Sequence, residues 1–348
     1  MPKIEKLFSM LLIVIGSIAV SFGVSEFISR AIFPKELQLR TFILGDRIVP
    51  WGASPLPSDF KDEIAVFKYC YEKSFHGFLD KDNCATHTVI PGGFRKGVPL
   101  APKRDGVFRI VVLGDSFTFG DGVEDNELFT SQLTYMLEGQ KFENKEIEII
   151  NLGIPAVDTA QELEVFNGQK DLLKPDLVIL QWNTNDFPSS AVAKLHENII
   201  QGHYMDLATP PPLIAWSRFL TTGWREYTRR KISHQLVSLT LEDLHLEPKN
   251  FEQIGILAKE VKDSNADFAL LIFPELYRFS DYPYQPIIDA LLNECRDKQI
   301  TCINLLPELK KFPDRTLWVH PTDLHPNKIA HHVAAEALNL FLRNRYAH

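Results

Sequence analysis

The sequence predicts an α/β domain built on a five-stranded parallel sheet and preceded by an N-terminal transmembrane helix. Five apolar runs alternate with helical patterns from residue 108 to the C-terminus. The runs are continuously apolar, which is typical of strands that a parallel sheet buries on both faces. A long stretch without charged residues stands near the N-terminus. Strands that alternate with helices favour right-handed crossovers within one sheet.

The predicted strands share continuous apolar character and cover 108–114 ("FRIVVLG"), 147–153, 176–183, 267–273 and 300–306. Helical spacing follows the first strand in "NELFTSQLTYMLEG". A second helix is predicted to begin at Thr159, with a capping box over Thr159–Glu162, and to turn apolar residues inward, namely Leu163, Phe166 and Leu173. The last helix runs from about Asn327 to Arg343, and its inner positions at i+4 spacing are Ile329, Val333, Ala337 and Phe341.

The N-terminal stretch Leu7–Ser25 has 19 residues without a charge and follows Lys3 and Lys6. About 20 apolar residues span a membrane as a helix, whereas the core of a signal peptide is nearer 7–15 residues. The length favours an uncleaved anchor. A cleavable signal is the alternative, because Ser17, Ala19 and Ser21 are small. Basic residues on both sides leave the orientation open.

Three regions are predicted along the chain. Residues 1–32 form the membrane anchor, 33–103 an irregular stalk and entry segment rich in proline and aromatic residues, and 104–348 the α/β domain. Within that domain, 187–246 breaks the alternation of strands and helices and is predicted to be a helical insertion over one edge of the sheet. It would serve either as a lid or substrate pocket, or as a membrane- or partner-facing element.

Composition excludes several classes of protein. A formal net charge of −8 without a basic stripe excludes general nucleic-acid binding. The cysteines form two local pairs, Cys70 with Cys84 and Cys295 with Cys302, which suits disulfides in an oxidising compartment, with four free thiols as the alternative. Neither pair has zinc spacing, and His331 and His332 lack a matching carboxylate pattern. No metal or cofactor is therefore expected.

Polar residues stand where the predicted strands end. Gly114–Ser116 follows the first strand, Asn151–Gly153 ends the second, and Asn183–Asp186 ends the third; Asp323 and His325 precede the last helix. Ligands bind outside the carboxyl ends of the strands in open parallel sheets. One edge therefore gathers a hydroxyl, amide donors, an imidazole and a carboxylate, as nucleophilic catalysis needs.

These blocks resemble the SGNH, or GDSL-type, hydrolase family over roughly Arg109 to Leu342. The matching segments, in chain order, are Gly114-Asp115-Ser116, "INLGIPAVDTAQEL", Asn185-Asp186 and "DLHPN". "GGFR" at Gly92–Arg95 resembles the segment before the first strand in membrane-linked members. Two positions depart from the pattern: Asn183 stands where the third block usually has glycine, and Asp323 lies two rather than three residues before His325.

The resemblance implies a flavodoxin-like three-layer sandwich and a serine hydrolase mechanism. Ser116 would be the nucleophile, His325 the base and Asp323 the acid that orients the imidazole. The backbone N–H groups of Ser116 and Gly153 and the side-chain amide of Asn185 would form the oxyanion hole. Asp115 is expected to shape the turn, and Gly120–Gly122 to be loop geometry.

The resulting functional hypothesis is a single-pass, membrane-anchored serine esterase or acyltransferase with its catalytic domain in the periplasm or on the outer face. It would act on O-acetyl or other O-acyl groups of a cell-surface glycan through an acyl-Ser116 intermediate. Lipid or thioester substrates are a weaker alternative. The hypothesis from another class is a non-catalytic SGNH-like scaffold or interaction subunit of a membrane assembly.

Overall fold

The computed structural model describes most of the chain. The described residues are 2–32, 40–44, 47–50, 64–73, 78–95, 100–186, 210–225, 227–228, 231, 251–282, 284–320 and 323–346. Much of the predicted insertion 187–246 therefore lies outside the described residues. Within it, only 210–225, 227–228 and 231 are described, and 218–225 is helical.

The main sheet has six strands in the order β11-β10-β9-β6-β8-β7. Its five parallel strands are β6 (Val107–Gly114), β8 (Lys145–Gly153), β9 (Leu177–Trp182), β10 (Asp267–Ile272) and β11 (Thr301–Asn304), and the two-residue β7 (Lys141–Phe142) adds an antiparallel edge. Numbered along the chain, the parallel strands lie in the order 2-1-3-4-5, which is the flavodoxin-like order. The predicted fold class is confirmed.

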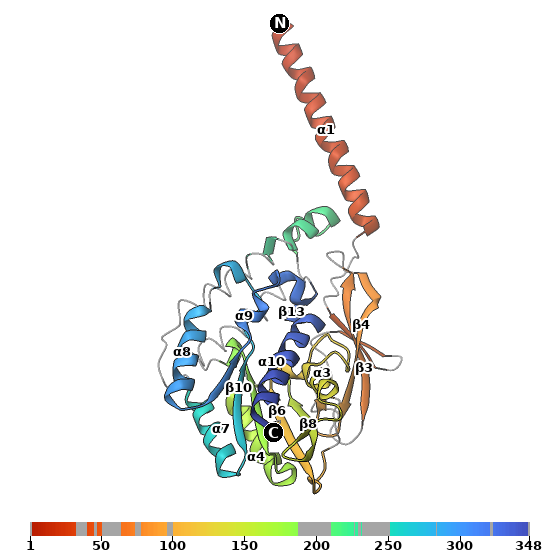
Figure 1. The fold of residues 1–348 in the computed structure, drawn as a ribbon. Helices are drawn as coiled ribbons and strands as arrows, with labels where there is room; N and C mark the ends of the chain where they lie inside the picture. Colours follow the sequence, from red (N-terminus) through yellow and green to blue (C-terminus); the bar gives the residue numbers. More distant parts are fainter. Residues whose placement is uncertain are drawn as a thin grey trace.

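Helices cover both faces of this sheet and make it the middle of three layers (Figure 1). One face packs on α4 (Thr159–Leu173), α7 (Glu252–Asp263) and α8 (Gln285–Asp297). The other face packs on α3 (Phe129–Met136), α9 (Leu306–Leu309) and α10 (Lys328–Tyr346). Successive residues of β6 alternate between the two cores: Val111 and Leu113 join the first, Ile110 and Val112 the second. Burial on both faces explains the continuous apolar runs.

The remaining short elements lie at the carboxyl ends of the strands or beside them. They are α2 (Ser116–Phe119), η2 (Thr184–Asp186), η4 (Phe279–Asp281), η5 (Asp314–Leu317), and the antiparallel pair β12 (Trp318–His320) and β13 (Asp323–Pro326).

A second sheet corrects the expectation of an irregular stalk over 33–103. Its antiparallel strands lie in the order β2-β1-β3-β4-β5 and are β1 (Arg40–Leu44), β2 (Arg47–Pro50), β3 (Ala65–Lys73), β4 (Phe78–Ile90) and β5 (Phe94–Arg95). Ala65, Phe67 and Tyr69 are buried, while Val66 between them is exposed. This alternation has the period of a strand with one buried face, a signal that the proline-rich flanks obscure. The region boundaries proposed from the sequence stay predictions.

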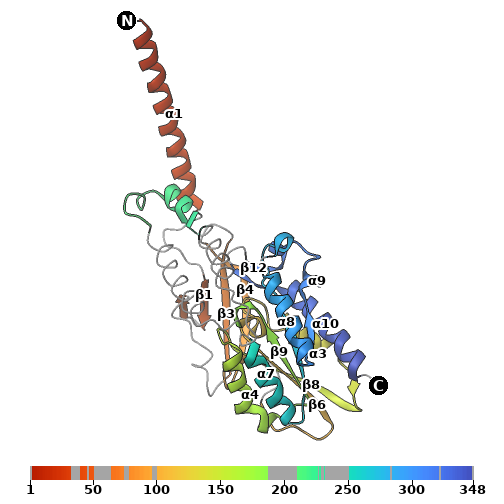
Figure 2. The same cartoon turned by 90° about the vertical axis from the view of Figure 1, so that its left-hand side faces the viewer.

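Helix α1 (Pro2–Ile32) projects from the body in both views (Figures 1 and 2). Its segment Met10–Ala31 is the one helix among the described residues that is long and apolar enough to cross a membrane, and none of its most apolar window is buried. A signal sequence near an N-terminus passes the same criterion of length and composition.

Two local predictions are wrong by small shifts. The capping box of α4 uses Asp158 and Gln161 rather than Thr159 and Glu162, because the Asp158 carboxylate accepts the Gln161 N–H at 3.0 Å. The side chain of Ile329 is 38% exposed instead of facing the core. The buried face of α10 begins one residue later, at Ala330, and continues through Ala334. Both predicted cysteine pairs are disulfides in the structure.

Candidate active site

Ser116 is the first residue of the short helix α2, which begins where β6 ends. Asp115 caps this helix: its Oδ1 accepts the backbone N–H of Phe117 at 2.8 Å. Gly114 has φ 155°, and a Cβ there would lie 2.2 Å from Thr118 Oγ1 and 2.6 Å from Gln181 Oε1. Only glycine therefore allows the chain to turn this sharply from the strand into the helix. The turn presents Ser116 at the carboxyl edge of the sheet.

Ser116, His325 and Asp323 form a hydrogen-bonded chain. Ser116 Oγ lies 2.9 Å from His325 Nε2, and His325 Nδ1 lies 2.5 Å from Asp323 Oδ1. Asp323 is buried and also accepts the backbone N–H of His325, at 3.2 Å. With a spacing of two residues, the Asp323 carboxylate thus contacts both the backbone N–H and the ring of His325 within β13. The arrangement can remove the Ser116 proton while holding the imidazole in one orientation.

Asp115 and Asn183 connect the ends of two strands. Asn183 Nδ2 donates to Asp115 Oδ2 at 2.9 Å, and both side chains are fully buried. The two residues follow β6 and β9, which flank the point where the strand order reverses. This is the topological switch point at which flavodoxin-like sheets bind ligands. The departure from glycine at Asn183 therefore supplies a donor that supports the turn before Ser116.

Asn151, near the end of β8, ties the nucleophile helix to the second strand. Its Nδ2 donates to the Thr118 carbonyl at 2.7 Å, and its Oδ1 accepts the Gly153 N–H at 2.9 Å. The Gly153 N–H predicted for the oxyanion hole is thus engaged with Asn151 in this structure. A Cβ at Gly153 would meet Phe119 N at 2.4 Å and the Thr118 carbonyl carbon at 2.7 Å. Close approach of two backbones is therefore what requires glycine here.

We expect Gly153→Ala to lower the free energy of unfolding by several kcal/mol, on the order of 2–4, because backbone atoms of α2 cannot move aside cheaply. Gly168→Ala is the matched control: Gly168 lies within α4, has open space around it, and should gain up to about 1 kcal/mol. Urea unfolding of the full chain in detergent measures both. Equal stability of the two variants would contradict the packing argument.

The other two predicted oxyanion donors are placed only in part. Ser116 is the first residue of α2, so helix geometry gives its N–H no acceptor within the helix. Asn185 lies in η2, directly after β9, and its side chain is outside the described part of the structure.

Asp121 is a site residue that the sequence argument missed. Its Oδ2 lies 4.0 Å from His325 Nε2, the nitrogen that faces Ser116. The segment Gly120–Gly122 is therefore more than loop geometry. Because Asp323 approaches the other ring nitrogen, two carboxylates flank the imidazole. Proximity in sequence to Ser116 was the only signal that could have pointed to Asp121.

Arg95, from the segment "GGFR", holds the loop that carries Asp121. The fully buried guanidinium donates to the carbonyls of Phe119, Gly120, Val123 and Thr86 and to the Asp125 carboxylate. Burial lowers the pKa of Arg95, and Asp125 opposes that shift. The second sheet thus contributes a cation that fixes the chain on the C-terminal side of α2.

His331 is structural, as is expected of a histidine within a core helix. Its Nδ1 accepts the Phe129 N–H at 3.1 Å, its ring stacks on Phe129, and burial lowers its pKa to about 3. It therefore stays neutral. Among the described residues, no group of three or more histidine, cysteine or acidic side chains is placed to hold a metal ion.

Buried acids lie behind the carboxyl ends of β6 and β9. Burial raises the pKa of Glu162 well above its usual range, and the nearby Asp186 and Asp115 add to the shift. Burial likewise raises the pKa of Asp186, although its Oδ2 accepts the Asn183 N–H at 2.9 Å. Both Glu162 oxygens lack a hydrogen-bond partner. Such groups favour the neutral form.

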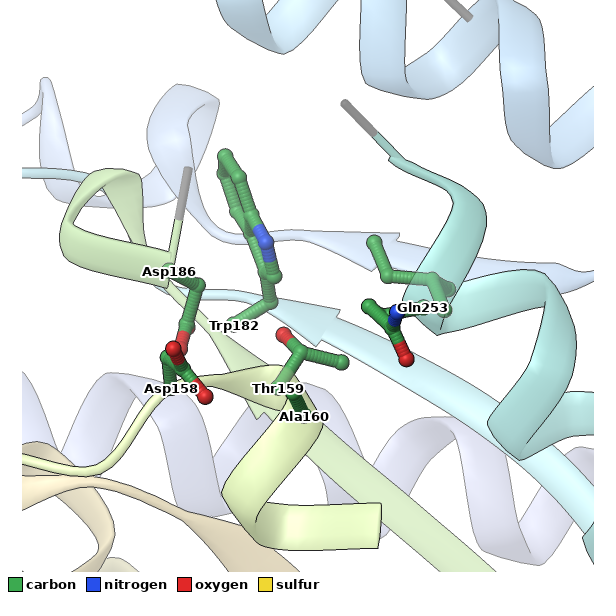
Figure 3. Close-up of a pocket in the computed structure, with 7 residues that line it drawn as sticks. Asp158, Thr159, Ala160, Trp182, Asp186 and Gln253 are labelled. Atoms are coloured by element: carbon green, nitrogen blue, oxygen red, sulfur yellow. The ribbon is translucent and has the colours of Figure 1, made fainter. Parts of the chain in front are cut away.

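A small cavity lies beside Asp186. In Figure 3 the Trp182 ring stands above Thr159, with Asp186 on one side and Gln253 on the other. The cavity is about 20 Å³, which is room for one water molecule and too small for an acyl chain. It is therefore not an acyl-binding pocket.

We expect Glu162→Gln to flatten the pH dependence of stability. An unfolded glutamate ionises near pH 4.3, whereas Glu162 keeps its proton in the fold. Glu162 should thus lower the free energy of unfolding of the wild type by up to about 1.4 kcal/mol per pH unit above that value. The glutamine variant should lack this contribution and keep the one made by Asp186. Urea titrations between pH 5 and 8 measure it, and the exposed Glu164→Gln on the same helix is the control. Equal slopes in wild type and Glu162→Gln would contradict the assignment.

Comparison with known proteins leaves the family open. No family model and no curated protein matches the sequence. Several solved structures are similar to the chain, among them three esterases or acyl hydrolases. A two-domain esterase active on acetylated mannans has a TM-score of 0.43 and 14% identity, over 68% of this chain and 49% of that one. The psychrotrophic esterase EstA from Pseudoalteromonas sp. has a TM-score of 0.41 and 15% identity, over 68% and 97%. The lipase/acylhydrolase from Enterococcus faecalis has a TM-score of 0.42 and 16% identity, over 68% and 96%. This chain thus spans about half the length of the first. At these identities and scores the similarity does not identify the function of this chain.

Proposed function

We propose that this chain is a serine esterase or acyltransferase, anchored in a membrane by α1, that acts on O-acetyl or other O-acyl groups of a cell-surface glycan. One observation carries the proposal: the continuous hydrogen-bonded chain from Ser116 Oγ through His325 to the buried Asp323. A hydroxyl is a weak nucleophile without such a base. A scaffold without catalysis has no need of this alignment.

The proposed reaction proceeds through an acyl-enzyme. Ser116 Oγ attacks the ester carbonyl carbon and passes its proton to His325 Nε2. The tetrahedral intermediate collapses, the bond to the alcohol oxygen breaks, and that oxygen takes the proton from Nε2. Water, or a sugar hydroxyl in transfer, then gives its proton to Nε2 and attacks the acyl carbon. The bond from that carbon to Ser116 Oγ breaks, and Oγ takes the proton back from Nε2. The carboxylate of Asp323 stabilises the imidazolium at each stage.

The proposed oxyanion hole uses the N–H of Ser116 and the side-chain amide of Asn185, with Gly153 as the third donor. The Gly153 N–H already donates to Asn151 Oδ1, so it has to be shared with the substrate oxygen or released to it. Loss of one such donor typically lowers turnover by about 10²–10³.

The proposed location is the extracytoplasmic side of a membrane. The apolar segment Met10–Ala31 supports an anchor, and two disulfides support an oxidising compartment. A catalytic domain held there would meet acylated surface glycans.

The negative charges beside His325 favour substrates with small neutral acyl groups. Asp121 and Asp323 flank His325, so a substrate carboxylate near Ser116 would meet two negative charges. We expect an acetyl ester to be cleaved faster than the succinyl ester of the same alcohol. Asp121→Asn should lower the ratio of kcat/KM for the acetyl ester to kcat/KM for the succinyl ester by on the order of tenfold. The reason is that charges a few ångströms apart near a surface interact by about 1–3 kcal/mol. kcat/KM for both esters measures the ratio, and an unchanged ratio would exclude Asp121 from acyl selection.

A fluorophosphonate probe tests the proposed function without knowledge of the substrate. The full chain in detergent should form one covalent adduct, and the modified peptide should contain Ser116. Incubation with an acetylated sugar and a second sugar as acceptor then separates free acetate from transferred acetate, and so distinguishes hydrolysis from transfer. Absence of any adduct at Ser116, together with absence of ester cleavage, would refute the proposal.

A further inference from the structure

The described part of the insertion, 210–225 with 227–228, packs against the end of α1. Glu26 accepts hydrogen bonds from Ser217 Oγ at 2.7 Å and from the N–H groups of Arg218 and Phe219 at 2.9 and 3.1 Å. Those two N–H groups belong to the first turn of the helix 218–225, so the Glu26 carboxylate caps that helix. Two segments about 190 residues apart are thereby joined.

Further contacts make this junction specific. The Arg30 guanidinium donates to the Trp216 carbonyl at 3.1 Å and also pairs with Glu26 at 2.6 Å. The ring of Phe22 lies 5.8 Å from that of Trp216 and 6.1 Å from that of Phe219. In both views the green segment stands at the base of α1 (Figures 1 and 2). The segment therefore has a defined position relative to the apolar helix.

In this segment the buried side chains are polar and the large apolar side chains are exposed. Its buried side chains are hydroxyl-bearing: Ser217, Thr221 and Thr228. Its large apolar side chains face outward: Leu213 is 87% exposed, Trp216 60%, Phe219 44% and Tyr227 67%. A helix in water places its apolar face inward. Outward apolar side chains, two of them tryptophan and tyrosine, are typical of a membrane–water interface.

The segment contacts α1 at the level where a membrane–water interface is expected. The charge-free part of α1, Leu7–Ser25, is 19 residues, which as a helix is about 28 Å and close to the thickness of a hydrocarbon core. Glu26 follows at once, so the residues that bind it lie where the hydrocarbon ends. An exposed patch continuous with a membrane span has the bilayer as its natural neighbour.

We infer that residues 211–225 form a second membrane contact, an interfacial element whose Leu213, Trp216 and Phe219 insert between the headgroups of the bilayer that α1 enters. The inference rests on the proposed membrane anchor. β12 and β13, the pair that includes His325, lie at the end of the body nearest α1 in both views. Two contacts instead of one would hold that end of the protein close to the membrane surface.

Fluorescence of the full chain in phosphatidylcholine–phosphatidylglycerol vesicles tests this inference. Leu213→Cys places one free thiol for an environment-sensitive NBD label, because the four native cysteines are paired. Ile13→Cys, within α1, reports on the anchor. Leu340→Cys, at an exposed position of α10, is the aqueous control. The C-terminus, which α10 approaches, lies at the end of the body opposite α1 (Figures 1 and 2). Lipids with a nitroxide at a shallow or a deep acyl position quench the label according to its depth.

The inference expects a blue-shifted emission at position 213 and loss of most of its intensity with the shallow nitroxide, deep quenching at position 13, and neither at position 340. If position 13 is quenched and position 213 is not, the anchor holds and the interfacial contact is wrong. A blue shift at 213 without lipid quenching would assign the patch to a second copy or another protein and overturn the inference. No quenching at position 13 would refute the anchor itself, and the interfacial contact with it.

Discussion

Ser116→Ala is expected to lower kcat/KM for ester hydrolysis by on the order of 10⁴–10⁶, because the side chain that would form the acyl-enzyme is lost. His325→Ala should cause a similar loss, since His325 Nε2 lies 2.9 Å from Ser116 Oγ and is the proposed base. The double variant should be no worse than either single one, because the two groups act as a unit. Steady-state hydrolysis of an acetyl ester by the full chain measures all three.

Two observations keep this prediction specific. The exposed Ser280→Ala should retain wild-type activity and fluorophosphonate labelling. Unfolding of Ser116→Ala in urea should match the wild type, because alanine fits the place of serine in α2 and the hydroxyl contacts the side chain of His325, which is partly exposed to water. Hydrolysis that survives in Ser116→Ala would remove Ser116 from the mechanism, whatever the geometry.

Arg95→Met is expected to lower the free energy of unfolding by about 3–5 kcal/mol, the range found when one partner of a buried ion pair is removed. The methionine would leave Asp125 without its cation and would remove one hydrogen-bond donor from each of four backbone carbonyls. Each unsatisfied buried group adds to the loss. Urea unfolding of the full chain in detergent measures the change.

Graded variants distinguish this role from a general loss of charge. Arg95→Lys keeps a cation beside Asp125 but lacks the planar set of N–H donors of the guanidinium. Its free energy of unfolding should therefore lie between those of the wild type and Arg95→Met. Arg104→Met, at an exposed position nine residues along the chain, should leave stability within about 0.5 kcal/mol of the wild type. If Arg95→Met unfolds at the wild-type urea concentration, the second sheet does not stabilise the loop after α2.

Much of the active-site edge was predictable because it follows from strand direction. Ser116 and His325 are 209 residues apart in the chain. Ser116 comes directly after β6, and His325 lies in β13, which follows β11, the last strand of the parallel sheet. Continuous apolar runs locate such strands, and parallel strands put their carboxyl ends on the same edge. No comparable rule exists for Asp121 or Asn183, whose partners depend on how a loop turns and which rotamer a side chain adopts.

One misjudged segment shows the limits of periodicity. The stalk region holds a five-stranded antiparallel sheet. Burial alternates over Ala65–Tyr69 in β3 and over Ala85–Val89 in β4, but these stretches are short and separated by polar residues and turns. For the insertion, the sequence allows either a lid or a membrane- or partner-facing element, and in the structure Leu213, Trp216 and Phe219 face outward. Spacing reports that one face differs from the other, and does not report which face the protein covers.

By itself, the sequence determined the parallel α/β sheet, the apolar N-terminal helix and the set of polar residues at one sheet edge, because burial on both faces and membrane-spanning length leave direct patterns in residue type. The tertiary structure alone decided that Ser116, His325 and Asp323 meet, that the Gly153 N–H is bound to Asn151, and that Glu26 joins α1 to a helix of the insertion. Those contacts link residues far apart in the chain. They depend on crossover paths, backbone turns and rotamers, which local patterns of polarity do not encode.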